Sequence, residues 1–285
     1  MSGEGSEQNT TGVGTGVAPE AGWDVDSVAT ELLACEAERR ERVKFTDEWP
    51  ELDVETGYTI QDETLCRRLE RGEKLVGVKL GLTSRAKQQR MGVEVPFVAW
   101  LTDAMTLPAG DPVPQDRLIH PRIEPEIVFV MRDRLEGPGI TGAQAFAAVE
   151  AVYGGAEIID SRYADFKFAA GDVIADNASS GAFVTGPIAL APTEVDLFTE
   201  GVLVEVDGEI VDSATGAAVQ GHPAEALALA ANDLAKRGLA IEAGWIVLTG
   251  GMTDAVFAPP GSSIACHFGS LGSIFINGGD EPQDA

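Results

Sequence analysis

The segment Ile119–Val130, I-H-P-R-I-E-P-E-I-V-F-V, constrains the fold of this sequence more than any other stretch. Its last four residues, together with Met131, form an uninterrupted apolar run over residues 127–131, which is typical of a strand covered on both faces. Glu124 and Glu126 lie two positions apart, so on a strand they point to the same face. Two carboxylates at the mouth of a buried strand repel each other, and a bound hard cation such as Mg²⁺, Mn²⁺ or Ca²⁺ is a simple compensation.

A third acid is available in the segment G-G-A-E-I-I-D, where Glu157 follows an expected helix and precedes another apolar pair. Three carboxylates would leave positions on an octahedral ion for water and for a substrate that binds through two oxygens. The spacing alone leaves an alternative open. Glu124 and Glu126 can instead form a solvated strand face, with Glu157 an isolated surface acid.

Composition narrows the class of protein and its partners. The 285 residues are 44% hydrophobic, as in a globular protein, and no apolar run is long enough for a membrane span. The start of the chain lacks the pattern of a secretion signal, and the three cysteines show neither metal spacing nor a disulfide framework, so we expect a cytoplasmic location. The formal net charge of −26 disfavours nucleic acid and anionic membranes as partners.

The pattern of apolar runs and breakers predicts a chain in four parts. We expect a disordered acidic tail over residues 1–22, a helical N-terminal region over 23–96, a β-rich catalytic domain over 97–278, and a frayed tail over 279–285. In the N-terminal region, Asp24 or Asp26 caps a helix to about Arg42, and Asp53 caps another that ends near Gly72. A buried strand over 75–82 and a short helix over 84–91 follow.

The expected catalytic domain consists of short apolar runs separated by glycine, proline and aspartate. The predicted strands cover residues 118–131, 156–160, 181–190, 201–206, 245–249, 263–267 and 273–276. The sequence V-E-V-D-G-E-I-V contains the Asp-Gly signal of a tight hairpin. Two helices interrupt this pattern, one over about 141–152 and one over 223–237.

Two further residues are candidates for catalysis. Lys79 stands inside the strand sequence V-G-V-K-L-G-L, where a lysine is unusual. It can face an anionic substrate or transfer protons, or it can extend its ammonium group to water. Asp103, in L-T-D-A-M, can be a general base or an orienting group, although a turn residue is the simpler interpretation.

Other polar residues are candidates for substrate binding. The segment D-V-I-A-D-N-A-S-S-G offers hydrogen-bond donors from Asn177, Ser179 and Ser180, unless it is an ordinary loop stabilised by its own side chains. The segment T-G-G-M-T-D, which contains Thr253, can form a cradle for a carboxylate.

Three basic residues lie among these acids. Arg122, Arg162 and Lys167 can offset the negative charge, hold a second carboxylate of a substrate, or form surface ion pairs. The three histidines share no spacing that suggests a metal site, and we assign them no chemistry.

These segments, taken in order over about residues 25–277, resemble the fumarylacetoacetate hydrolase superfamily, in the branch of 2-oxopent-4-enoate hydratases and 4-oxalocrotonate decarboxylases. The matching segments are V-K-L-G-L-T-S-R-A-K, M-G-V, L-T-D-A-M, H-P-R-I-E-P-E-I, A-x-E-I-I-D-S-R-Y, V-I-A-D-N-A-S-S and G-W-I-V-L-T-G-G-M-T. Three of them, G-L-T-S-R-A-K, I-H-P-R-I-E-P-E-I and I-D-S-R-Y-x-x-F-K-F, look more like the decarboxylases. The acidic tail at the start departs from the family pattern.

The resemblance implies an α+β fold with a mixed β-roll core and N-terminal helices packed on it. It implies a divalent cation, Mg²⁺ or Mn²⁺, held by Glu124, Glu126 and Glu157, with Lys79, Asp103 and Ser179 facing the substrate. It further implies assembly into homo-oligomers. Together with the local patterns above, it predicts that Asn177, Thr253, Arg162 and Lys167 also bind substrate.

The resemblance also implies a reaction in the catabolism of aromatic compounds. The expected activity is decarboxylation of 4-oxalocrotonate (2-oxohex-3-enedioate) to 2-hydroxypenta-2,4-dienoate and CO₂. Three alternatives remain: a hydratase that adds water to the dienoate, an acylpyruvate hydrolase, and a non-catalytic scaffold subunit of a hydratase–decarboxylase complex. The partners implied are a 2-oxo dicarboxylate or dienoate, further copies of this chain, and a sister hydratase or decarboxylase.

Overall fold

The structure is a computed structural model that describes residues 22–83, 88 and 96–281. The expected acidic tail before residue 22 lies outside the described residues. So do the short helix expected over 84–91, apart from residue 88, and the last four residues of the chain.

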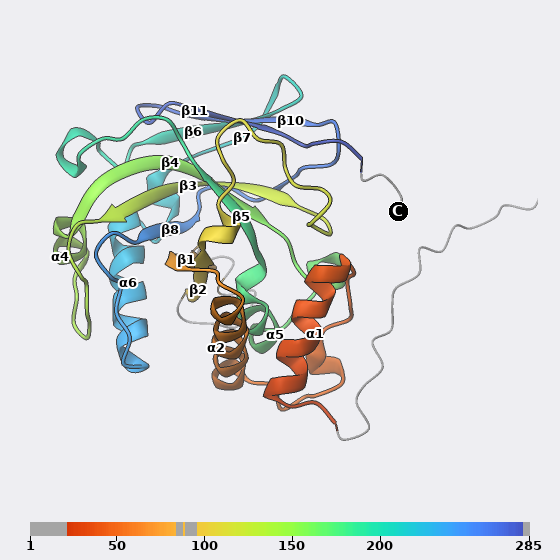
Figure 1. Cartoon of the computed structure of the whole chain (residues 1–285). Helices are drawn as coiled ribbons and strands as arrows, with labels where there is room; N and C mark the ends of the chain where they lie inside the picture. Colours follow the sequence, from red (N-terminus) through yellow and green to blue (C-terminus); the bar gives the residue numbers. More distant parts are fainter. Residues whose placement is uncertain (1–21, 84–87, 89–95, 282–285) are drawn as a thin grey trace, which may run out of the picture.

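Two helices begin the described chain, α1 (Val25–Glu38) and α2 (Val54–Glu70). Each begins as predicted, because the Asp24 carboxylate accepts the Ser27 N–H at 2.8 Å and the Asp53 carboxylate accepts the Thr56 N–H at 2.8 Å. α1 ends earlier than expected, since Arg39 adopts a left-handed conformation with φ 52°. α2 packs against α1 and against the short helix α5 (Ala170–Ala175), and Figure 1 shows the three helices grouped on one side of the molecule.

A seven-stranded sheet forms the centre of the molecule. Its strands are β1 (Leu75–Gly81), β2 (Phe97–Thr102), β3 (Arg122–Met131), β4 (Val149–Ile159), β5 (Ser180–Thr185), β8 (Ile246–Gly251) and β9 (Val256–Phe257). They are ordered β2-β1-β8-β3-β4-β5, with β9 paired to β3. β1 and β8 are parallel and the other pairs are antiparallel, so the sheet is mixed. The long strands β3 and β4 curve over helix α6, as Figure 1 shows.

A second sheet has the order β11-β10-β6-β7. It consists of β6 (Gly201–Val206), β7 (Glu209–Thr215), β10 (Ser263–Phe268) and β11 (Ser273–Asn277). The predicted Asp-Gly hairpin joins β6 to β7, with φ angles of 52° at Asp207 and 89° at Gly208. Apolar residues of both sheets and of α6 (Pro223–Lys236) form one core. The expected α+β fold with a mixed sheet and N-terminal helices is therefore confirmed.

The helix expected over 141–152 is wrong in extent. α4 covers only Gly142–Ala147, and β4 begins at Val149. Residues 149–159 pair with β3 along almost its whole length, and this backbone pairing overrides the local helical signal. The strand β2 and the helix α5 were not anticipated either.

The expected division between residues 96 and 97 falls between β1 and β2, which hydrogen-bond to each other in the central sheet. The strand expected at 75–82 therefore belongs to the same sheet as the strands that follow it. Among the described residues, no helix is both long enough and apolar enough to cross a membrane.

The contact between α2 and α5 leads to a stability prediction. A Cβ added at Gly57 would lie 2.6 Å from the Gly171 carbonyl oxygen of α5. Glycine to alanine inside a helix ordinarily adds about 1 kcal/mol of stability. We expect Gly57→Ala to reduce the free energy of unfolding instead, by about 1–3 kcal/mol, because the helices must move apart.

Thermal and denaturant unfolding of Gly57→Ala would measure this effect. Gly201→Ala is a suitable control, since an added Cβ there would have its nearest neighbour at 3.9 Å. A Gly57→Ala protein more stable than the parent would show that the helices are not in close contact.

Candidate active site

The pairing of β3 with β4 brings the three glutamates together. Glu124 lies directly opposite Glu157, and Glu126 follows on the same face of β3, opposite Gly155. One carboxylate oxygen from each glutamate lies within 4.8 Å of the others. The sequence predicted this group, although the register that brings Glu157 to the other two could not be inferred from one sequence.

Neighbouring glycines make room for these carboxylates. The Gly250 N–H donates to Glu126 Oε2 at 2.7 Å, and Gly250 has a φ of 106°. A Cβ at Gly251 would lie 2.6 Å from Glu124 Oε2. The Thr-Gly-Gly segment therefore does cradle a carboxylate, but the carboxylate is the protein's own Glu126.

The buried carboxylates lack full compensation for their charge. Glu126 has no exposed surface, and its Oε1 has no hydrogen-bond partner among the described residues. Burial, with repulsion from Glu157 and Glu124, raises the pKa of Glu126 well above its usual range. Burial also raises the pKa of Glu157, and the charge of Lys79 partly offsets this effect. Such a set of oxygen ligands with an unpaired buried oxygen fits a divalent cation.

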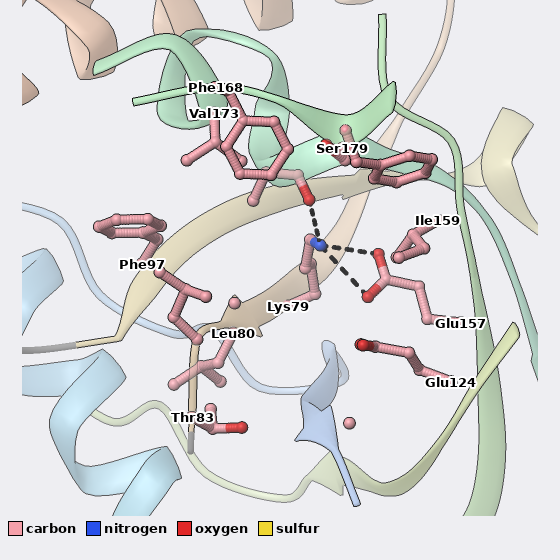
Figure 2. A pocket seen from close by; sticks show the side chains of 15 residues that line it. Lys79, Leu80, Thr83, Phe97, Glu124, Glu157, Ile159, Phe168, Val173 and Ser179 are labelled. Carbon is pink, nitrogen blue, oxygen red and sulfur yellow. Dashed lines mark hydrogen bonds and ion pairs between the residues drawn. The ribbon is translucent and has the colours of Figure 1, made fainter. Parts of the chain in front are cut away.

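Lys79 is the cation that faces this group. Its side chain is 3% exposed, so the alternative in which the ammonium group reaches water is wrong. Its Nζ lies 2.9 Å from Glu157 Oε1 and 3.2 Å from Oε2, and it donates to the Ala178 carbonyl oxygen at 2.6 Å. In Figure 2 dashed lines join Lys79 to Glu157, and Glu124 lies beside Glu157.

An unusual turn positions the Ala178 carbonyl. Asn177, Ala178 and Ser179 all have positive φ angles, of 48°, 51° and 58°, which is costly for residues other than glycine. The Asn177 side chain holds the turn in place, because it accepts the Trp100 N–H and donates to the Trp100 carbonyl, both at 2.9 Å. Strain of this kind in successive residues is typical of a functional site.

A pocket opens beside the glutamates and Lys79, with a cavity volume of about 140 Å³. The polar residues of its lining are Lys79, Thr83, Glu124, Glu157 and Ser179. The apolar residues are Leu80, Leu82, Phe97, Ile159, Phe166, Phe168 and Val173. Figure 2 shows Phe97, Phe168 and Val173 on the far side of Lys79 from Glu124. The pocket thus suits a ligand with a chelating anionic end and a less polar chain.

Of the residues predicted from sequence, Lys79, Ser179, Glu124 and Glu157 line this pocket, and Glu126 joins the carboxylate cluster. Ser179 is buried, and its hydroxyl lies 3.4 Å from Asp176 Oδ2.

The structure places the other predicted residues away from the pocket lining. Asp103 is exposed at the far end of β2, where its carboxylate accepts the Lys74 N–H at 2.9 Å, in agreement with the turn interpretation. The Asn177 side chain is bound to the backbone of β2, and the Thr253 hydroxyl donates to the Asp254 carbonyl at 2.9 Å. None of the three lines the cavity.

The two predicted basic residues are also engaged elsewhere. Arg162 is buried, where it pairs with the Asp176 carboxylate and donates to the Asp176 and Ser180 carbonyls. The side chain of Lys167 is 78% exposed and pairs with Asp165 at 2.8 Å. The structure therefore gives neither residue a free donor in the pocket.

Sequence reasoning missed the aromatic wall. Phe166 and Phe168 flank Lys167 in the sequence, and both line the pocket. The alternation F-K-F could have indicated this wall, because the two phenylalanines point inward if Lys167 faces water. The hydroxyl of Ser180, considered as a donor to substrate, instead donates to Glu157 at 3.1 Å.

The raised pKa values lead to a prediction for the metal-free protein. At Glu126 and Glu157 the folded state holds protons more tightly than the unfolded chain, so the associated stability is present at low pH and lost as pH rises. We expect the unfolding temperature without metal to fall as the pH rises above the usual pKa range of carboxyl groups, with a smaller fall in Glu126→Gln. Identical pH profiles for the two proteins would contradict the charge assignment.

Comparison with known proteins supports a relationship over most of the chain. The family profile described as fumarylacetoacetate (FAA) hydrolase C-terminal matches residues 74–276. A 4-oxalocrotonate decarboxylase from Pseudomonas putida is 44% identical over 248 residues, which cover 87% of this chain and 94% of the relative. A 2-hydroxypent-2,4-dienoate hydratase from Pseudomonas putida is 40% identical over 217 residues, or 76% of this chain and 98% of the relative.

Among solved structures, 4-oxalocrotonate decarboxylase from Pseudomonas putida G7, complexed with magnesium and adipate, superposes with a TM-score of 0.87. It is 43% identical in sequence, and the match covers 89% of this chain and 96% of the other.

Proposed function

The chain belongs to the fumarylacetoacetate hydrolase family, and from this premise we propose that it is a metal-dependent lyase acting on a 2-oxo acid. The proposed reaction is decarboxylation of 4-oxalocrotonate (2-oxohex-3-enedioate) to 2-hydroxypenta-2,4-dienoate and CO₂. The observation that carries this proposal is the cluster of Glu124, Glu126 and Glu157 beside the buried Lys79, at a pocket that also has apolar walls. The similarity to decarboxylase relatives over nearly their full length favours this reaction within the family.

We infer that the three glutamates hold Mg²⁺ or Mn²⁺. The ligands are all carboxylate oxygens, which these ions prefer, and the unpartnered Oε1 of Glu126 is a free coordinating atom. A related decarboxylase structure is complexed with magnesium, which supports this choice. When bound, the cation supplies a Lewis acid for the carbonyl group of a 2-oxo acid.

Lys79 provides the positive charge that the chain itself contributes. Its Nζ is fixed by Glu157 and the Ala178 carbonyl and lies in the wall of the pocket. Breaking the bond to the distal carboxylate releases an electron pair that passes through the substrate double bond to the 2-oxo oxygen. The ammonium group stabilises the negative charge that develops on this oxygen. Ser179, in the same wall, donates a hydrogen bond to the carboxylate of the 2-oxo acid.

The apolar part of the pocket lining favours the proposed step. The electron pair passes along the carbon chain of the substrate, and apolar walls around that chain exclude water, which strengthens the electrostatic effect of Lys79 on the 2-oxo oxygen. Phe97, Phe168 and Val173 provide such a wall. Asp103, Asn177, Thr253, Arg162 and Lys167 have no part in this proposal, because their polar groups are engaged outside the cavity.

A hydratase is the second candidate, since a hydratase relative is 40% identical. Both reactions pass through a dienol of the same 2-oxo acid, so the glutamates and Lys79 serve either one. An acylpyruvate hydrolase has less support, because none of the three histidines lines the described part of the pocket to activate water.

Purified protein with Mg²⁺ can be offered 2-oxohex-3-enedioate and, separately, 2-hydroxypenta-2,4-dienoate, with CO₂ and products measured. CO₂ from the first and no turnover of the second is the expected result. Conversion of the dienoate to a 4-hydroxy-2-oxo acid without CO₂ from the dicarboxylate would establish the hydratase. Turnover of neither substrate by a metal-loaded protein would overturn both lyase assignments and favour the scaffold alternative.

We also infer that the chain forms homo-oligomers. Leu203, Ile210 and Phe275 lie on the same outer face of the second sheet with 45%, 52% and 67% of their surface exposed. Light scattering tests this expectation, and a monomer at micromolar concentration would contradict it. Mixing with a hydratase relative would test the predicted complex with a sister enzyme.

A further inference from the structure

Arg122 stands on the same face of β3 as the metal-binding candidates, two residues before Glu124. It lies between Ile159 of β4 and Phe257 of β9, its directly paired residues on the two neighbouring strands. Ile159 lines the pocket. On this face of the sheet, the pair Arg122 and Ile159 is therefore the next cross-strand pair after Glu124 and Glu157.

Two aromatic rings hold the Arg122 side chain. Its guanidinium carbon lies 3.9 Å from the ring centroid of Phe166 and 4.2 Å from that of Phe257. Phe166 is itself part of the pocket wall. Stacking on flat rings fixes the plane of a guanidinium group and leaves its N–H groups, which lie at the edge of that plane, free to bind a carboxylate.

The hydrogen-bonding capacity of Arg122 is largely unused. Its Nε is buried and has no hydrogen-bond partner, and no ion pair joins Arg122 to another described residue. Asp165 is near enough to act on Arg122 through its charge, but its carboxylate is paired with Lys167. A buried donor without a partner is costly, and a ligand that supplies an acceptor relieves this cost.

The other two basic residues singled out in the sequence do not compete for this role. Arg162 is bound to Asp176 inside the protein, and Lys167 is on the surface. Among the described residues, Arg122 is thus the arginine that combines a place beside the pocket wall with an unsatisfied donor.

We propose that Arg122 binds the distal carboxylate of the substrate and so selects dicarboxylic over monocarboxylic 2-oxo acids. This inference rests on the proposed function for the identity of the substrate. Two residues along a strand advance about 6.8 Å, which is comparable to the length of a six-carbon diacid. A substrate whose 2-oxo acid end lies at Glu124 and Glu157 therefore extends its other carboxylate toward Arg122.

The chemistry of the step gives this role a kinetic signature. The distal carboxylate leaves as CO₂, so its charge is smaller in the transition state than in the bound substrate. Arg122 therefore stabilises the bound substrate more than the transition state. Loss of Arg122 should raise KM by about 10- to 100-fold and leave kcat unchanged or higher.

The test uses two unreactive ligands of equal chain length, 2-oxoadipate and 2-oxohexanoate. Their binding to the Mg²⁺-loaded protein and to Arg122→Gln is measured by calorimetry. We expect the parent protein to prefer the dicarboxylate and the preference to fall by about 10- to 100-fold in Arg122→Gln, with 2-oxohexanoate affinity unchanged. Arg122→Lys should restore part of the preference, since it keeps the charge but loses the planar fork.

Arg134→Gln is the matched control. Arg134 pairs with Glu136 and Glu242 on the surface, and its loss should leave the preference unchanged. Unchanged selectivity in an Arg122→Gln protein that decarboxylates 4-oxalocrotonate would overturn this role and leave the proposed function intact. If Arg122→Gln loses the preference for the dicarboxylate but the parent protein does not decarboxylate 4-oxalocrotonate, the binding role is supported and the proposed function is overturned.

Discussion

Glu126→Gln is expected to lose Mg²⁺ binding and catalytic activity together, with activity lower by roughly three orders of magnitude or more. Glutamine keeps an oxygen that can accept the Gly250 N–H, so the local backbone is preserved. It removes the negative charge of the fully buried carboxylate and puts an NH2 group in place of its unpartnered oxygen. An amide is a much weaker ligand for Mg²⁺ than a carboxylate.

The same substitution should make the metal-free protein more stable near neutral pH. The pKa of Glu126 is raised, so its ionisation in the folded state is unfavourable, and a neutral side chain avoids that cost. Calorimetric titration with Mg²⁺ and thermal unfolding with and without metal measure both effects. Glu150→Gln, at an exposed position of the same strand β4 that carries Glu157, is the control. Normal metal affinity and activity in Glu126→Gln would refute the carboxylate site.

Lys79→Met has the second large effect that we expect. Methionine fills a similar volume without charge, so kcat should fall by about 100- to 1,000-fold through loss of the charge that stabilises the developing oxyanion. Mg²⁺ binding should persist, because the three glutamates remain. This separation of activity from metal binding distinguishes Lys79→Met from Glu126→Gln.

Removing Lys79 also leaves the buried Glu157 carboxylate without its cation. The metal-free variant should therefore be less stable than the parent, and added Mg²⁺ should raise its unfolding temperature by more than it raises that of the parent. Lys74→Met, one residue before β1 and exposed, controls for the loss of a positive charge. A Lys79→Met enzyme with nearly normal kcat would remove Lys79 from the mechanism.

The parts of the site that follow from strand periodicity were predictable from the sequence. Glu124 and Glu126 share a face because side chains alternate along β3, and Lys79 is buried because the residues around it form an interior strand. Helix starts at Asp24 and Asp53 and the hairpin at Asp207-Gly208 follow equally local rules.

The parts that depend on long-range pairing were not predictable in this way. The position of Glu157 opposite Glu124 depends on the register of β3 with β4, and local patterns favoured a helix where β4 begins. The carbonyl that contacts Lys79 depends on three non-glycine residues with positive φ, which no single-residue preference anticipates. Asn177 had the correct polarity for a binding residue, but its amide serves the backbone of β2.

The same distinction explains the basic residues. Arg122, Arg162 and Lys167 were equivalent in sequence, because charge alone does not reveal which partner a side chain finds. The structure separates them into an arginine stacked beside the pocket, an internal ion pair and a surface lysine.

The most direct test of the proposed activity follows the carbon that leaves. The protein with Mg²⁺ would be incubated with 2-oxohex-3-enedioate labelled with heavy carbon in the distal carboxylate, and the gas released would be analysed by mass spectrometry, with Glu126→Gln as the blank. We expect labelled CO₂ and unlabelled 2-hydroxypenta-2,4-dienoate from the parent protein, and neither from the blank. Retention of the label in the organic product, or its release at the same rate by the blank, would contradict the account.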